Sequence, residues 1–218
     1  MKKYTFVHFL VLWFTKLTGI IPCLLFYKPR VHLMNEKASR KLPKPAMLVS
    51  NHKSLLDFPL YLMLFPFRTM RFQMAEVLYN KSKIFAWFLH CLGGIRVNRD
   101  TQDMAFIGNT LEILDQGGTV GIFPEGRLPV NGVPWPYKPS VAYIALHTNA
   151  PIIPIYTDGN YGIKKRANVM IGEPIDVRKY LNGEEVNQES YNRIASILEA
   201  NRNEMQAELE RRLNKNGK

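Results

Sequence analysis

Short apolar runs that stop abruptly are the feature that most limits the possible folds of this chain. The run AMLVS, residues 46–50, ends at Asn51-His52, and similar runs cover residues 118–123 and 151–156. Each has the length of a buried strand, and its continuous apolar character fits a strand that packs on both faces. The prolines of the run 151–156 suit strand ends or an edge strand. We therefore expect buried strands at these three places.

Helical patterns alternate with these runs. They cover residues 57–65, 82–92, 102–116 and 188–213. Thr101 is a good N-cap for the third of them, and Asp103 would lie in its first turn. The last is a long amphipathic pattern with one apolar side. Because strands and helices alternate, the sequence predicts an α/β fold, a mixed and mostly parallel sheet flanked by helices.

Positive charge is concentrated at the N-terminal end. The formal net charge of the 218 residues is +11. Residues 1–46 hold nine Lys or Arg and one acid, a balance of +8, whereas the rest of the chain holds twenty and seventeen, a balance of +3. The same part contains the apolar stretch 4–27. An apolar stretch flanked by cations is typical of a segment that binds a membrane with anionic lipids.

Lys16 divides this stretch into two apolar pieces, and each is too short to cross about 30 Å of hydrocarbon as a helix. We expect two short helices, broken near Gly19 and Pro22 and embedded from one face of the bilayer. A single tilted span is the alternative. A cleaved signal peptide is not expected, because no small-residue cleavage site follows. The sequence predicts a membrane-associating helical segment over residues 1–40 and one folded domain over residues 41–218.

The two cysteines, Cys23 and Cys91, give neither a disulfide framework nor the spacing of metal ligands. Both are expected to pack as small apolar side chains, which fits a reducing compartment. We expect no metal and no other cofactor. Together with the basic, apolar N-terminus, this indicates a membrane-associated protein on the cytoplasmic face of the inner (cell) membrane.

His52 and Asp57 are candidate partners beside the first apolar run. Residues five apart lie about 140° apart around a helix axis, so these two side chains cannot meet within one regular helix. They can meet if His52 lies at a strand-to-helix junction and the helix begins near Asp57. Pro59 favours such a start, and Ser54 or Asp57 could cap the helix. A carboxylate bonded to one imidazole nitrogen would make the other nitrogen a general base.

The pair alone is weak evidence of catalysis, because His52 could be an ordinary strand-end residue and Asp57 an ordinary helix cap. The sequence contains no G-x-S-x-G elbow, Walker A loop, G-x-G-x-x-G or H-E-x-x-H motif. It does place Arg99 and Glu125-Gly126-Arg127 at predicted element ends. Two arginines there could hold a phosphate. The alternatives are a solvated loop charge for Arg99 and an ion pair between Arg127 and Glu125.

Four ordered blocks resemble those of the glycerolipid acyltransferase family. They are NHKSLLD (51–57), GGIRVNR (93–99), FPEGR (123–127) and APIIPI (150–155). The best-known bacterial members of this family acylate 1-acylglycerol 3-phosphate. The resemblance implies that residues 41–218 form an acyltransferase domain. It also implies that the chain transfers a fatty acyl group from acyl-CoA or acyl carrier protein to that lipid, giving phosphatidic acid.

The resemblance also implies roles for individual residues. The histidine of the first block is the base that deprotonates the acceptor hydroxyl and the aspartate orients it, and these roles fall on His52 and Asp57. The fourth block is associated with the acyl donor. The second and third blocks bind the glycerol phosphate, which implies Arg99, Glu125, Gly126 and Arg127.

Two departures from the family pattern concern the acceptor. The usual third block continues Glu-Gly-Thr-Arg-Ser, whereas Arg127 here comes one position early, as in lysophospholipid acyltransferases that act on glycerophosphoethanolamine lipids. Tyr137-Lys138-Pro139-Ser140 stands where Phe-Lys-x-Gly is usual, which leaves Lys138 as a candidate for substrate binding. A lysophosphatidylethanolamine-type acceptor is therefore the alternative to 1-acylglycerol 3-phosphate.

The expected partners are membrane lipid, a lysophospholipid acceptor and the acyl-CoA or acyl carrier protein donor. The alternative from another class is a non-catalytic membrane-surface protein, in which the four blocks are structural. Nucleic acid is not expected as a partner. The N-terminal aromatic residues lie in continuous apolar runs instead of alternating with Lys or Arg, which argues against base stacking.

Overall fold

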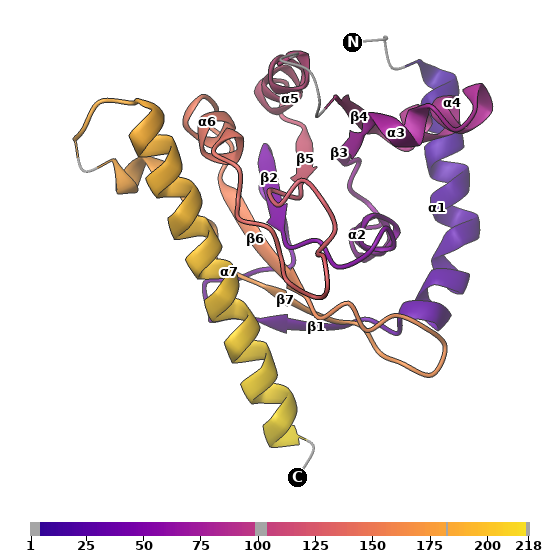
Figure 1. Ribbon diagram of the computed structural model, residues 1–218. Coiled ribbons are helices and arrows are strands. Elements are labelled where there is room, and N and C mark those ends of the chain that lie inside the picture. Colours follow the sequence, from indigo (N-terminus) through magenta and orange to yellow (C-terminus); the bar gives the residue numbers. More distant parts are fainter. Residues whose placement is uncertain (1–4, 99–103, 182, 217–218) are drawn as a thin grey trace.

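The computed structural model describes residues 5–98, 104–181 and 183–216. Its centre is a seven-stranded sheet in the order β1-β7-β6-β2-β5-β3-β4 (Figure 1). The strands are β1 (Arg30–Leu33), β2 (Ala46–Ser50), β3 (Arg71–Ala75), β4 (Gly94–Val97), β5 (Thr119–Ile122), β6 (Ile152–Thr157) and β7 (Asn168–Ile171). Within these residues every neighbouring pair is parallel except β6 and β7. The predicted α/β class and the mixed, mostly parallel sheet are confirmed.

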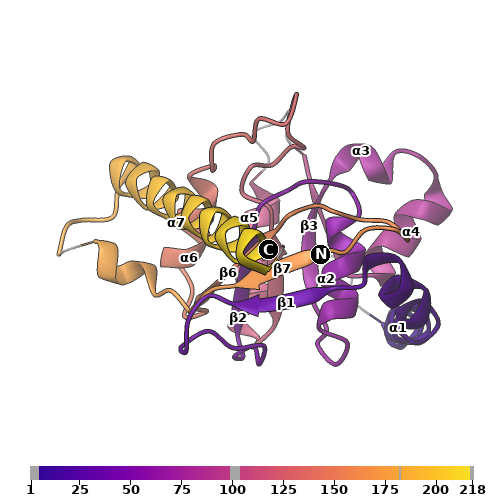
Figure 2. The same cartoon turned by 90° about the horizontal axis from the view of Figure 1, so that it is seen from below.

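Helices cover both faces of this sheet (Figures 1 and 2). They are α1 (Phe6–Tyr27), α2 (Asp57–Leu64), α3 (Glu76–Tyr79), α4 (Lys83–Cys91), α5 (Ala105–Asp115), α6 (Ser140–Leu146), the 3₁₀ helix η1 (Val177–Tyr180) and α7 (Gln188–Asn216). Alternate residues of β2 point to opposite faces. Met47 and Val49 pack in a core with α5, α6 and α7, whereas Ala46 and Leu48 pack in a second core with α2 and α4.

The register of the sheet brings three loops to one edge. In β2, Val49 lies opposite Ile122 of β5 and opposite Pro154 of β6. These strands are parallel, so their carboxyl ends stop at nearly the same level. Ligand and catalytic sites of open α/β sheets lie at this edge. The loop after β2 begins with Asn51-His52, and the loop after β5 contains Glu125.

Pro154 lies inside β6, and β6 is an interior strand, so the expectation of strand ends or an edge is wrong for this proline. The antiparallel ladder with β7 begins at the next residue, Ile155. The missing N–H therefore falls at the end of that ladder, where its loss has least effect. The carbonyl of Pro154 still accepts the N–H of Gly172 at 2.9 Å.

α5 begins at Ala105, with Met104 at its N-cap position. The predicted cap Thr101 and the predicted first-turn Asp103 lie outside the described residues. The other helices expected around residues 57–65, 82–92 and 188–213 are present as α2, α4 and α7.

The N-terminal segment is one continuous helix, and the expectation of two short helices is wrong. α1 runs from Phe6 to Tyr27 with Pro22 inside it. Gly19 does not break it but allows close packing, because a Cβ at this position would lie 3.0 Å from Cε of Met63 in α2. Packing of α1 along α2 and α4 offsets the backbone hydrogen bond that a proline removes.

Lys16 fastens α1 to the rest of the domain. Only 3% of the side chain is exposed, and its ammonium donates to three carbonyl oxygens just beyond α2. The distances are 3.2 Å to Phe65, 3.1 Å to Pro66 and 2.6 Å to Arg68. These carbonyls belong to a chain reversal where the backbone has few partners of its own. Lys16, which divides the apolar stretch in the sequence, therefore faces the protein and not its surroundings.

The opposite side of α1 is apolar and exposed. Phe14, Leu17, Ile21 and Leu25 are each 64–70% exposed. Among the described residues, α1 is the helix whose length and composition would allow it to cross a membrane. The boundary placed after residue 40 stays a prediction, and β1, which precedes it, is an edge strand of the sheet.

The contact of Lys16 can be tested by replacing it with alanine. The substitution leaves the carbonyls of Pro66 and Arg68 without this donor, whereas that of Phe65 keeps the N–H of Arg68 at 3.1 Å. We therefore expect the free energy of unfolding to fall by roughly 2–4 kcal/mol. Denaturant titration of the detergent-solubilised protein would measure this. Leu17→Ala changes the next, exposed residue and should shift stability by less than about 0.5 kcal/mol. Equal effects of the two substitutions would contradict the anchoring role.

Candidate active site

Asn51 fixes the chain at the end of β2. Its side-chain amide donates to the carbonyl of Thr157 at 2.9 Å and accepts the N–H of Thr157 at 2.8 Å. The side chain thus continues the pairing of β2 with β6 by one more step. It is 1% exposed, so both bonds form away from water. Sequence reasoning assigned no role to Asn51, although a polar residue at the end of a buried run was a usable signal.

His52 and Asp57 have the predicted geometry. Asp57 is the first residue of α2, His52 lies before that helix, and Nδ1 of His52 is 2.8 Å from Oδ2 of Asp57. A carboxylate accepts, so the imidazole donates from Nδ1 and keeps Nε2 as an acceptor. The ring of His52 stacks on Phe123 with centroids 4.3 Å apart, which fixes its plane. The pairing at a strand-to-helix junction is confirmed.

Neither Ser54 nor Asp57 caps α2, and this expectation is wrong. The N-cap position is Leu56, with no side-chain cap. Oδ2 of Asp57 instead accepts the N–H groups of Lys53 at 2.8 Å and Ser54 at 2.9 Å. The carboxylate therefore organises the turn before the helix, and the same turn carries His52. The hydroxyl of Ser54 accepts the N–H of Leu56 at 3.1 Å.

Tyr161 supplies the remaining donor to Asp57. Its hydroxyl donates to Oδ1 of Asp57 and lies 3.1 Å from the hydroxyl of Thr157. Burial raises the pKa of Tyr161, and the negative charge of Asp57 raises it further, so the phenol keeps its proton and remains a donor. Its ring meets Tyr27 of α1 edge to face at 5.2 Å. Sequence reasoning missed Tyr161, because nothing local marks a partner 104 residues away.

Glu125 is 2% exposed and contacts the backbone of His52. Its Oε1 accepts the N–H of His52 at 3.4 Å, while its Oε2 has no hydrogen-bond partner in the described part of the chain. Burial raises the pKa of the Glu125 carboxyl, and the charge of Arg202 opposes the rise. A buried carboxylate oxygen without a donor is costly, which agrees with the raised pKa of this carboxyl.

Gly126 and Lys138 lie side by side. Gly126 has φ 68°, and a Cβ there would be 3.1 Å from Cε of Lys138. Both the backbone angle and the neighbour therefore favour glycine. The N–H of Lys138 donates to the carbonyl of Pro124 at 3.0 Å, which closes the loop after β5. The structure thus brings Lys138 back to the Glu125-Gly126 turn.

Of the two arginines predicted to bind phosphate, the structure describes only Arg127. Arg127 is exposed and makes no ion pair among the described residues, so the alternative of a pair with Glu125 is not realised. Arg99 lies outside the described residues. The nearby Arg96 forms an ion pair with Glu76.

Side chains of α7 contact the loop that carries Glu125. Arg202 of α7 is 6% exposed, and its Cζ lies 5.7 Å from the ring centroid of Tyr137. Glu199 accepts the N–H of Tyr137 at 2.9 Å and lies 3.4 Å from the guanidinium of Arg202. The amphipathic pattern predicted α7, but it gave no indication that Arg202 and Glu199 hold this loop.

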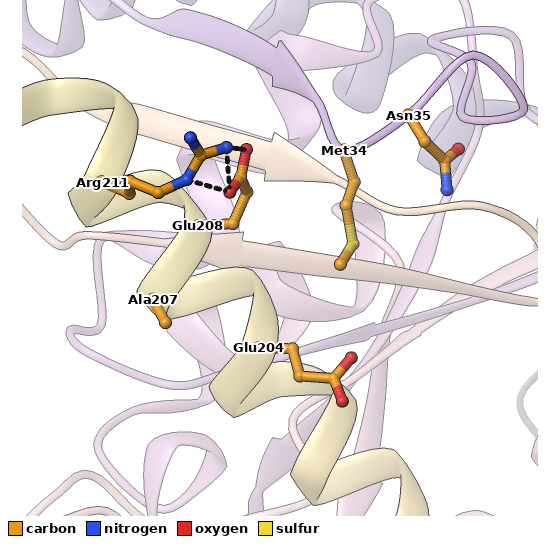
Figure 3. A pocket seen from close by; sticks show the side chains of 6 residues that line it. All are labelled: Met34, Asn35, Glu204, Ala207, Glu208 and Arg211. Carbon is orange, nitrogen blue, oxygen red and sulfur yellow. Dashed lines mark hydrogen bonds and ion pairs between the residues drawn. The ribbon is translucent and has the colours of Figure 1, made fainter. Parts of the chain in front are cut away.

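A hollow beside α7 is a separate feature (Figure 3). It has a volume of about 440 Å³ and is lined by Met34, Asn35, Glu204, Ala207, Glu208 and Arg211. None of the described site residues lines it. A second hollow of about 320 Å³ lies between α1 and α2, with Cys23, Tyr27 and Leu60 in its wall. No group of three or more His, Cys, Asp or Glu side chains within the described residues could hold a metal ion.

The arrangement can remove a proton from a hydroxyl. Nδ1 of His52 is held by a buried carboxylate, which orients the ring and favours positive charge on it when Nε2 accepts a proton. The exposed guanidinium of Arg127 stands at the neighbouring strand end and can meet an anionic group.

This chain is similar in sequence to known acyltransferases. A family model described as Acyltransferase matches residues 30–158. The human 1-acyl-sn-glycerol-3-phosphate acyltransferase alpha is 33% identical over 117 residues, 51% of this chain and 40% of the relative. The chloroplastic 1-acyl-sn-glycerol-3-phosphate acyltransferase BAT2 of Brassica napus is 27% identical over 180 residues, 79% of this chain and 48% of the relative. The chain thus spans about half the length, or less, of these relatives.

A solved structure has a similar fold. The crystal structure of the 1-acyl-sn-glycerophosphate acyltransferase PlsC from Thermotoga maritima aligns with a TM-score of 0.61. The alignment covers 95% of this chain and 84% of that one, at 20% sequence identity. At this identity the likeness shows a shared fold.

The contribution of Tyr161 can be measured with Tyr161→Phe, which removes only the hydroxyl. Asp57 then loses a donor in a buried place, so the free energy of unfolding should fall by about 1.5–3 kcal/mol. Chemical denaturation followed by circular dichroism would give the value. Tyr143→Phe is the matched control, because that hydroxyl has no partner among the described residues, and its effect should stay within about 0.5 kcal/mol. A Tyr161→Phe protein as stable as the control would refute the assigned contact.

Proposed function

The chain belongs to the acyltransferase family, and on this basis we propose that it transfers a fatty acyl group from an acyl thioester to the free hydroxyl of 1-acylglycerol 3-phosphate. The product is phosphatidic acid. The names of the relatives support this acceptor. The observation that carries the proposal is the 2.8 Å contact between Nδ1 of His52 and the buried carboxylate of Asp57.

In the proposed reaction His52 is the general base. Nε2 takes the proton of the acceptor hydroxyl as the oxygen attacks the thioester carbonyl. Asp57 orients the imidazole and stabilises its positive charge, since Oδ2 faces Nδ1. The tetrahedral oxyanion collapses by expelling a thiolate, which needs little assistance as a leaving group. The mechanism forms no covalent intermediate with the protein.

The loop after β5 is the proposed site for the glycerol phosphate. Arg127 supplies an exposed guanidinium that has no ion pair with any residue the structure describes, and such a group can bind phosphate through two hydrogen bonds. Arg99 and Lys138 are proposed to add positive charge. Oε2 of Glu125, which is buried and has no hydrogen-bond partner in the described part of the chain, is proposed to accept from a glycerol hydroxyl of the bound acceptor. The N–H of Gly126 already donates to the carbonyl of Phe123 at 2.9 Å, so Gly126 contributes shape.

The proposed donor is acyl-CoA or acyl carrier protein, and no cofactor takes part. Both donors are polyanionic, and the basic N-terminal region favours their approach electrostatically. The exposed apolar side of α1 is proposed to hold the domain on the cytoplasmic face of the inner (cell) membrane. An acceptor lipid could then reach His52 from the bilayer.

A second acceptor is a lysophosphatidylethanolamine-type lipid. The observation that favours it is the order Glu125-Gly126-Arg127, in which the arginine directly follows the glycine. Labelled acyl-CoA offered with a panel of lysolipids would decide between the two head groups. A non-catalytic membrane-surface protein would consume no thioester with any of them.

The central test is His52→Ala. Loss of the general base should lower kcat by about 10²–10⁴-fold while the protein still folds and binds membrane. Thiol release from acyl-CoA with 1-acylglycerol 3-phosphate would measure it. His147→Ala removes an exposed histidine and should leave turnover unchanged. Turnover of His52→Ala at the wild-type rate would exclude the mechanism.

Arg127→Ala tests the phosphate site. Loss of one charged hydrogen-bonding partner should raise KM for the anionic acceptor by about 10–100-fold and leave kcat nearly unchanged. Initial rates over a range of acceptor concentrations separate the two constants. Arg211→Ala, which removes a surface arginine of α7, is the control. An unchanged KM would remove Arg127 from the site.

A further inference from the structure

The loop between β6 and β7 exposes an apolar residue next to three cations. Ile163 is 73% exposed, and Lys164, Lys165 and Arg166 follow it at the surface. None of the three cations forms an ion pair within the described residues. A run of charges alone would be an ordinary solvated surface. One exposed aliphatic side chain is ordinary too, so what distinguishes Ile163 is the surface that lies beside this loop.

The position of this loop is fixed by the end of α1. The ammonium of Lys28 donates to the carbonyl of Ile163 at 2.6 Å. The N–H of Ala167 donates to the carbonyl of Tyr27 at 2.8 Å, and the N–H of Arg30 donates to the carbonyl of Ala167 at 2.8 Å. Figures 1 and 2 both show the loop beside the C-terminal end of α1. Ile163 is therefore held next to the membrane-binding helix.

Apolar and basic surfaces meet at this place. In the last two turns of α1, Ile21 and Leu25 are 66% and 64% exposed. Lys28 and Arg30 are also exposed and bring the local set of cations to five with the three of the loop. Apolar side chains bordered by Lys and Arg are the pattern of surfaces that insert into the interface of an anionic bilayer. The aliphatic groups enter the acyl region and the cations meet the lipid phosphates.

We propose that the loop 159–166, together with Lys28 and Arg30, is a second membrane-contact surface that binds anionic phospholipids beside α1. Ile163 enters the bilayer interface, and Lys164, Lys165 and Arg166 contact head-group phosphates. This surface goes beyond the anchoring by α1 and does not depend on the catalytic mechanism. The same loop carries Tyr161, whose hydroxyl donates to Asp57. The same loop would therefore contact the membrane and hold Asp57 in place.

The test compares two double variants of equal charge in the full chain. Lys164→Gln/Lys165→Gln removes two cations of the loop, and Lys179→Gln/Lys215→Gln removes two exposed cations of η1 and α7. Each cation at an anionic membrane surface contributes about fivefold to binding, so the loop variant should lose about 25-fold in partition coefficient. Sedimentation with vesicles of phosphatidylcholine and phosphatidylglycerol measures it. The control variant should partition like the wild type.

Further measurements separate the apolar contribution to membrane binding from the ionic contribution. On vesicles of phosphatidylcholine alone the loop variant should equal the wild type, whereas Ile163→Ser should bind less to both kinds of vesicle. High salt should reduce the difference between the loop variant and the wild type on anionic vesicles. Turnover with detergent-solubilised substrates should be unchanged in the loop variant.

Two results would overturn the proposal. One is equal partitioning of the loop variant and the control variant on anionic vesicles. The other is unchanged vesicle binding with a raised KM for acyl-CoA in detergent, which would assign these cations to the phosphates of the donor. Vesicle binding needs no turnover, so the first result is independent of the proposed acyl transfer. A measurable KM in the second result itself shows that acyl transfer takes place.

Discussion

The carboxylate of Asp57 holds the candidate site together. It is fully buried and receives hydrogen bonds from the imidazole of His52, two backbone N–H groups and the hydroxyl of Tyr161. A buried charge is tolerated only when donors surround it in this way. Because those donors come from the turn before α2 and from the loop after β6, one side chain sets the shape of both. The orientation of His52 follows from the same contacts.

The sheet supplies the frame in which this carboxylate can act. The parallel strands β2, β5 and β6 end at one level, so His52, Glu125 and Tyr161 come together although they are far apart in the chain. The amide of Asn51 extends the pairing of β2 with β6 beyond its last strand residue. On the far side, Arg202 and Glu199 of α7 fix the Glu125 loop through Tyr137. The site is therefore held in place by the strand ends of the sheet and by helices on both of its faces.

The sequence predicted those features that depend on residues close together in the chain. The buried strands, the main helices and the meeting of His52 with Asp57 followed from apolar runs, from Pro59 and from the angle between residues on a helix. The continuity of α1 did not, because packing on α2 outweighs the effect of Gly19 and Pro22. The roles of Asn51 and Tyr161 depend on partners more than 100 residues away, which a single sequence does not pair. Arg202 was hidden for the same reason, since charge on an amphipathic helix normally indicates its solvent side.

The attachment of α1 has a consequence for synthesis on the ribosome. The carbonyls that receive the ammonium of Lys16 follow it by 49 to 52 residues, so this helix cannot be seated until α2 and the turn beyond it have been made. The next element, β1, pairs with β7, and Arg30 must wait for Asn168. α1 and β1 are thus completed late, when most of the sheet already exists. During that interval the side of α1 that later packs on α2 is uncovered as well, and a bilayer close to the site of synthesis can cover the helix.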